Sequence, residues 1–131
     1  MRKFEFKKLV RDNIIKAMQN DPGQKTTWHK LDSKEFIVEL IRKLLEEASE
    51  LRVASSEEIL GELADIQEII NTILEELEIS REQLETEMER KRQKAGGFKE
   101  RAFVEFNEVN PDNQAVIDIY LRQPGKYPEI K

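Results

Sequence analysis

Cysteine is absent from this chain of 131 residues, and histidine and tryptophan occur once each. Without cysteine, the chain has no disulfides, iron–sulfur clusters or thiol nucleophiles. The single histidine, His29, has no second histidine or cysteine with which to share a metal, and it lies outside any Glu-x-x-His motif of the kind that di-iron bundles require. The glycine-rich P-loop and dinucleotide-binding motifs are also missing. These chemistries are therefore poor candidates for its function.

Long apolar runs are missing as well, since hydrophobic residues make up 38% of the chain and charged residues 37%. No stretch is long enough to span a bilayer, and the opening residues lack the apolar core of a signal peptide, so we expect a cytoplasmic protein without a membrane partner. The net charge of -5 argues against a general binder of nucleic acid polymers. A chain of this size builds only a modest core, so part of its apolar burial is expected from a second subunit.

Three stretches combine helical spacing of apolar residues with a capping pattern at their start. In each, a residue that favours helix N-termini is followed three positions later by Glu or Gln, which is the spacing of a capping box. The first helix is expected to begin at Asp32 and to end near residues 53–56, and the third to stop before Gly96 and Gly97. The three pairs are Asp32 with Glu35, Ser55 with Glu58, and Ser80 with Gln83.

Shorter elements flank these helices. Apolar spacing predicts a short helix over residues 9–18, ended by a turn at residues 21–23, and a last one over residues 113–121. Residues 98–106 alternate in part and favour one short extended segment, whereas residues 123–131 are typical of a tail.

We predict an all-α fold in which an antiparallel helical hairpin and additional helices form a bundle that oligomerisation completes, as a homodimer or homotetramer. Residues 1–131 are expected to form one domain, with a core at about residues 8–106 and a C-terminal extension at residues 107–131. The hairpin is expected to expose an apolar seam on its second helix, which includes Ile69, Ile70, Ile73, Leu74 and Leu77.

Four acids interrupt or flank the apolar stripes of the two long helices. Glu47 falls inside the stripe of the first helix, and Glu62 falls inside that of the second. Glu50 and Asp65 each follow three positions later. Both pairs lie roughly two turns from the connecting loop, so in an antiparallel hairpin they would face each other within ~4.5 Å along the axis. The stripes are Leu40, Leu44 and Leu51 on the first helix, and Ile59, Ile66 and Ile69 on the second.

Such a group of acids is costly without a counter-ion. Two carboxylates ~4 Å apart repel by about 4 kcal/mol at an effective dielectric constant near 20. Four together would take up protons or bind cations, and their hard oxygen atoms suit Mg²⁺, with Mn²⁺ as an alternative. Helix-forming glutamates also fill solvent-facing positions, but the joint inward phase on two adjacent helices favours a metal site.

The acids also resemble a known motif. EEASE at residues 46–50, followed by ELAD at residues 62–65, resembles the EExxE…ExxD motif of the all-α nucleoside triphosphate pyrophosphohydrolases, the MazG-like group that includes phosphoribosyl-ATP pyrophosphohydrolase. KLVRDNI at residues 8–14 is similar to the opening KLVRDKI of that group. KRQKAGGF at residues 91–98 is similar to the basic segment with GGF that follows its third helix. The resemblance covers about residues 8–106.

This resemblance implies Mg²⁺-dependent hydrolysis of a nucleoside triphosphate between the α and β phosphates. By position, Glu47, Glu50, Glu62 and Asp65 would be the metal ligands. Glu46 would hold a ligand in place or orient the attacking water. Either Glu47 or Glu50 would accept the proton of that water.

Basic residues offer a complement to the acids. Lys91, Arg92 and Lys94 precede the two glycines and could hold the outgoing pyrophosphate, although cations also favour helix C-termini for electrostatic reasons. Lys8 and Arg11 are similar candidates, with Asp12 expected to orient Arg11. Two other functions stay open: the same chemistry on phosphoribosyl-ATP, which suits the KLVRDNI opening less well, and a non-catalytic helical interaction module.

Overall fold

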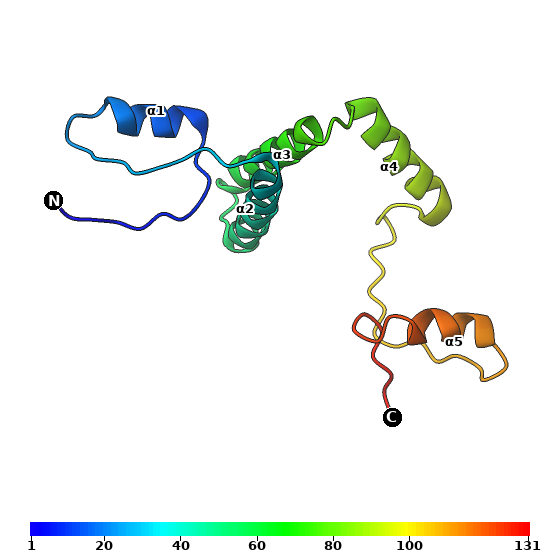
Figure 1. Ribbon diagram of the computed structural model, residues 1–131. Coiled ribbons are helices and arrows are strands. Elements are labelled where there is room, and N and C mark those ends of the chain that lie inside the picture. The colour runs from blue at the N-terminus through cyan, green and yellow to red at the C-terminus, as the bar shows by residue number, and fades with distance from the viewer. The chain divides into compact units, whose positions relative to one another are not determined.

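The computed structural model describes residues 1–131 and contains five helices and no strand (Figure 1). The predicted all-α class is confirmed. The expected extended segment at residues 98–106 forms no strand, because a lone segment has no partner with which to share ladder hydrogen bonds. None of the helices combines the length and the apolar character needed to cross a membrane. The helices are α1 (Asp12–Asn20), α2 (Ser33–Val53), α3 (Ile59–Glu76), α4 (Arg81–Ala95) and α5 (Gln114–Leu121).

Local capping sets the start of α2 and α4. The carboxylate of Asp32 accepts a hydrogen bond from the Glu35 amide at 2.8 Å, as the sequence predicts. At α4 the capping box is complete, because Ser80 Oγ accepts from the Gln83 amide at 3.1 Å while Gln83 Oε1 accepts from the Ser80 amide at 2.7 Å. The α4 helix ends before Gly96, whose φ of 80° lies in the left-handed region that glycine adopts without strain.

The predicted capping box at Ser55 and Glu58 is wrong. The hydroxyl of Ser55 donates to the carboxylate of Glu58 at 2.7 Å, so it caps no backbone amide of the helix. The Ser55 carbonyl instead accepts from the amides of Glu58 and Ile59, at 3.0 and 3.1 Å, and closes a turn. Helix α3 therefore begins at Ile59, later than the capping pattern predicts.

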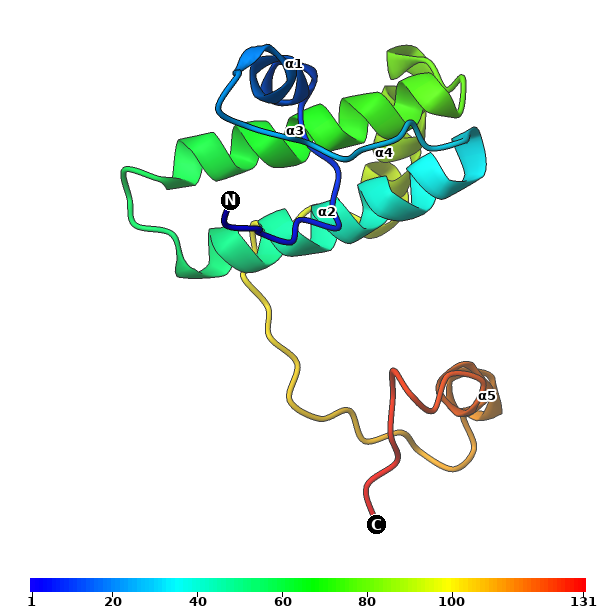
Figure 2. The same ribbon diagram turned by 60° about the vertical axis from the view of Figure 1, so that its left-hand side comes forward.

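The chain divides into two compact units, residues 1–94 and residues 95–131. In the first unit, α2 and α3 follow each other in the chain and lie side by side, and theirs is the one extensive contact between helices (Figure 2). Leu40 on α2 and Ile69 on α3 are the buried apolar residues of this contact, and Glu47 is buried with them. The core is thin, because no side chain is completely buried.

The apolar seam expected on α3 is mostly covered. Ile69 is buried, and only Leu77 of that set is exposed, because α3 turns most of this face toward α2. Exposed apolar side chains lie instead along α2 and at the start of α3. They are Val38, Ile41, Leu45, Val53, Ile59, Leu60 and Leu63.

The second unit is built around α5, which confirms the short helix predicted over residues 113–121. The rings of Tyr120 and Tyr127 lie 4.9 Å apart between centroids, so part of the predicted tail folds against the helix. Asn107, which precedes α5 in the chain, donates a hydrogen bond from its side-chain amide to the Tyr120 hydroxyl at 2.7 Å. These contacts make residues 107–127 a small local cluster.

Candidate metal centre

Three carboxylates converge between α2 and α3. Glu47 comes from α2, while Glu62 and Asp65 come from one face of α3, where a spacing of three residues places them together. One oxygen from each lies within 4.8 Å of the others. These three acids could hold a metal ion. A metal site is also what the positions of Glu47 and Glu62 within the apolar stripes predict.

Glu50, the fourth predicted ligand, lies outside this tight group. Glu50 is exposed, yet its carboxylate is close enough to Glu47 to raise the pKa of the Glu47 side chain. Glu50 therefore borders the three acids from the solvent side, and its role as a ligand stays a prediction.

The carboxylate of Glu47 is the buried polar group of the protein, with 7% of the residue exposed. Its Oε2 atom and that of Glu62 are both buried without a hydrogen-bond partner. An unpaired buried polar group costs about 1–3 kcal/mol, and more when it is charged. Oxygen atoms of this kind are the hard donors that a divalent cation takes, so the residues fit a metal ion.

Burial raises the pKa of the Glu47 carboxyl to about 7, and the neighbouring carboxylates of Glu62, Glu50 and Asp65 add to the rise. The physical cause is that removal from water and nearby negative charge both disfavour the ionised form. A cation bound among these acids would reverse both effects, because it compensates the charge of Glu47 directly.

Cations already border the acids. Arg11 Nη2 lies 2.7 Å from Asp65 Oδ1, and Lys8 Nζ lies 3.8 Å from Glu46 Oε1. The two predicted phosphate-binding residues ahead of α1 are thus beside the acids of α2 and α3. Asp12, expected to orient Arg11, makes no ion pair with it, because Arg11 reaches across to Asp65 instead.

Lys43 also contacts the acids, although the sequence did not predict it. Its Nζ lies 3.9 Å from Glu47 Oε1, one turn earlier on α2. The spacing of four residues between Lys43 and Glu47 is the pattern that could have identified the pair. Lys43 partly balances one oxygen of Glu47 and leaves the other, Oε2, without a partner.

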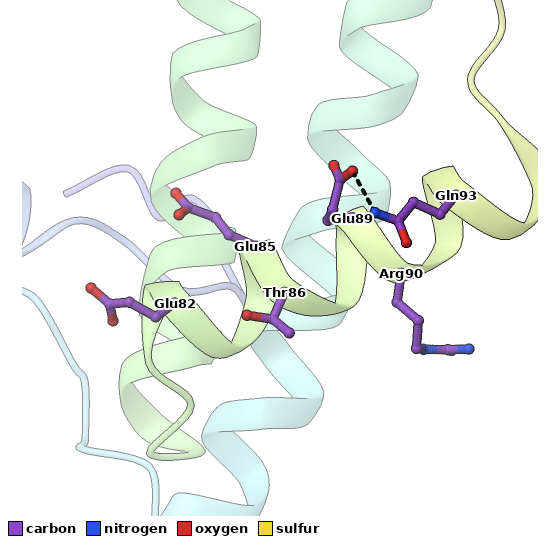
Figure 3. A pocket seen from close by; sticks show the side chains of 6 residues that line it. All are labelled: Glu82, Glu85, Thr86, Glu89, Arg90 and Gln93. Atoms are coloured by element: carbon purple, nitrogen blue, oxygen red, sulfur yellow. Dashed lines mark hydrogen bonds between the residues drawn. The ribbon is translucent and has the colours of Figure 1, made fainter.

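The basic residues of α4 have different surroundings. Arg92 pairs with Glu89 on its own helix at 2.8 Å, and no ion pair joins α4 to the acids of α2 and α3. Lys91 and Lys94 are exposed. Figure 3 shows the side chains that line an open hollow along one face of α4, and none of the three converging acids belongs to this lining. Its lining residues are Glu82, Glu85, Thr86, Glu89, Arg90 and Gln93.

Comparison of the chain with protein-family models, with curated proteins and with solved structures finds no match. The geometry of Glu47, Glu62 and Asp65 and the sequence segments around them are the features that indicate a function.

Proposed function

We propose that this chain is a divalent-metal-dependent nucleotide pyrophosphohydrolase, which cleaves a nucleoside triphosphate to the monophosphate and pyrophosphate. One observation carries the proposal: Glu47, Glu62 and Asp65 converge between two helices, and two of their oxygens are buried without a partner. The resemblance of EEASE and ELAD to the MazG-like motif supplies the reaction, since these residues contain the same three acids.

Mg²⁺ is the proposed cofactor, and Mn²⁺ would replace it, because every candidate ligand is a carboxylate oxygen. Glu47, Glu62 and Asp65 would hold the ion, and Glu50 would complete the set from the solvent side. When bound, such an ion supplies neutralisation of phosphate charge and a positioned water.

The remaining acids and the bordering cations have roles that follow from their places. Glu46 lies next to Glu47 in sequence and is paired with Lys8, so its carboxylate is held close to the ligands and would orient the attacking water. Glu47 or Glu50 would accept the proton from that water. Lys8 and Arg11 would bind the phosphates of the substrate.

The three cations of α4, Lys91, Arg92 and Lys94, remain proposed ligands of the outgoing pyrophosphate. Two of them, Lys91 and Lys94, have no carboxylate within ion-pair distance, so their ammonium groups are available to an anion. Gly96 adds an accessible backbone directly after them.

A homodimer or homotetramer is the proposed assembly, with the α2–α3 hairpins paired across subunits. Val38, Ile41 and Leu45 form an exposed apolar stripe along α2 at helical spacing. Pairing of hairpins would cover this stripe.

The proposal is tested by incubating the chain with a panel of nucleoside triphosphates and phosphoribosyl-ATP, with Mg²⁺ or Mn²⁺, and measuring pyrophosphate. We expect release from at least one nucleoside triphosphate, and its loss in Glu47→Gln and Glu62→Gln. Glu85→Gln on α4 is the matched control and should retain the wild-type rate. Preference for phosphoribosyl-ATP would favour the alternative substrate, and hydrolysis of none of them would favour the interaction module.

A further inference from the structure

Arg11 already neutralises one of the three converging acids. Its guanidinium donates a 2.7 Å hydrogen bond to Asp65 Oδ1, although the two residues are 54 positions apart in the chain. Arg11 is the N-cap residue of α1, so this cation is carried by the segment that leads into the first helix. A positive charge from the chain itself is therefore already paired with one of the three carboxylates that could hold a metal ion.

The same segment has a second contact with the acids. Lys8 pairs with Glu46 on α2 at 3.8 Å, so residues 8–11 contact both α2 and α3. The backbone that leads into α1 runs past these two helices (Figure 2). Both ion pairs are solvent-accessible, with the side chains of Lys8 and Arg11 about half exposed. Exposed ion pairs contribute little to stability and are easily exchanged. The contact is thus suited to reversible displacement.

We propose that Arg11 is a counter-ion that metal binding displaces: a divalent cation at Glu47, Glu62 and Asp65 takes Asp65 from Arg11 and releases the guanidinium to bind the substrate's phosphates. The inference rests on the metal centre of the proposed function and adds an order to it, with metal before nucleotide.

Repulsion between like charges favours the release of Arg11 when a metal ion binds. A guanidinium and a divalent cation on the same carboxylate repel each other, so each weakens the binding of the other. The two equilibria are linked: the factor by which metal binding weakens the Arg11–Asp65 contact equals the factor by which that contact weakens metal binding. Once released, the planar guanidinium has a geometry that matches phosphate oxygens.

The first test is a Mn²⁺ titration of the full chain without nucleotide, followed by electron paramagnetic resonance of the free ion. Arg11→Gln removes the competing charge and should bind Mn²⁺ about two- to fivefold more tightly than wild type, the range expected for loss of an exposed ion pair. Arg42→Gln is the matched control, since Arg42 pairs with Glu39 on α2. It should bind Mn²⁺ as wild type does.

The second test follows Arg11 itself. In ¹⁵N nuclear magnetic resonance spectra, added Mg²⁺ should move the Arg11 side-chain Nε–H signal toward the position of a free arginine, and the Arg42 signal should stay in place. In Glu47→Gln, more Mg²⁺ should be needed for the same change. An Arg11 signal that ignores Mg²⁺, or an Arg11→Gln affinity no tighter than that of Arg42→Gln, would overturn the proposal.

The outcomes separate this inference from the proposed function. If Arg11→Gln binds Mn²⁺ more tightly but wild type hydrolyses no nucleotide, the displacement stands and the enzyme assignment fails. If wild type releases pyrophosphate but Arg11→Gln binds Mn²⁺ equally or more weakly, the displacement fails alone, and Arg11 positions Asp65 instead. If wild type binds no Mn²⁺, both are overturned.

Discussion

Glu47 on α2 and Glu62 on α3 meet between the two helices, each with one buried carboxylate oxygen that has no hydrogen-bond partner. An apolar pair at these positions would pack without penalty, whereas two carboxylates repel each other, and burial raises the pKa of Glu47. The arrangement becomes favourable when a cation lies between them.

Glu47→Gln should abolish most pyrophosphate release, by about 100-fold or more. Glutamine keeps the shape of the side chain but loses the negative charge that holds a cation and the oxygen that accepts a proton. Pyrophosphate release under saturating Mg²⁺ is the measurement, and Glu85→Gln on α4 is the control for loss of a negative charge elsewhere. A variant with wild-type turnover would remove Glu47 from the site.

Ionisation of Glu47 should make the stability of the chain depend on pH. Its pKa is raised to about 7 in the folded chain, so its contribution to stability is complete below the ordinary value near 4.5 and is lost as the pH rises to about 7. The loss amounts to as much as about 3 kcal/mol. Urea unfolding in a chelator should therefore find Glu47→Gln more stable than wild type at pH 8, and no more stable at pH 5. Equal differences at both pH values would contradict the assigned pKa.

Mg²⁺ should stabilise the chain, and more so at pH 8 than at pH 6. A ligand at 100 times its dissociation constant adds about 2.7 kcal/mol to the free energy of unfolding. The gain should shrink at pH 6, because protons compete for Glu47. Thermal unfolding with Mg²⁺ and after chelation measures it. Glu62→Gln should show a smaller shift, and an unchanged shift in that variant would place the ion elsewhere.

Leu45→Glu should weaken the proposed assembly of hairpins. The side chain is 66% exposed on the apolar stripe of α2, where a partner hairpin would cover it. A charge buried in such an interface has no partner, so sedimentation velocity at micromolar concentration should shift from dimer or tetramer toward monomer. Phe103→Glu is the control, an equally drastic change at a residue of the second unit that is 89% exposed. A wild-type chain that sediments as a monomer would contradict the proposed assembly.

The sequence by itself determined the helices and predicted the three acids that converge, Glu47, Glu62 and Asp65. The starts of α2 and α4 follow from Asp32 and Ser80, whose bonds are made within one turn. Glu47 and Glu62 were found because the 3.6-residue period is a property of a single helix. Even a local pattern can fail: Ser55 has the spacing of a capping box, but its hydroxyl donates to the Glu58 carboxylate instead of accepting from a backbone amide.

Only the tertiary structure decided which charges meet. Glu50 follows Glu47 by three positions as Asp65 follows Glu62, but Asp65 joins the tight group and Glu50 remains exposed at its edge. The packing of α2 against α3 decides which residues of the two helices come together. The bond from Arg11 to Asp65 spans 54 positions, and no local pattern encodes a contact of that length. Periodicity places a residue on the face of its own helix, and packing decides what that face meets.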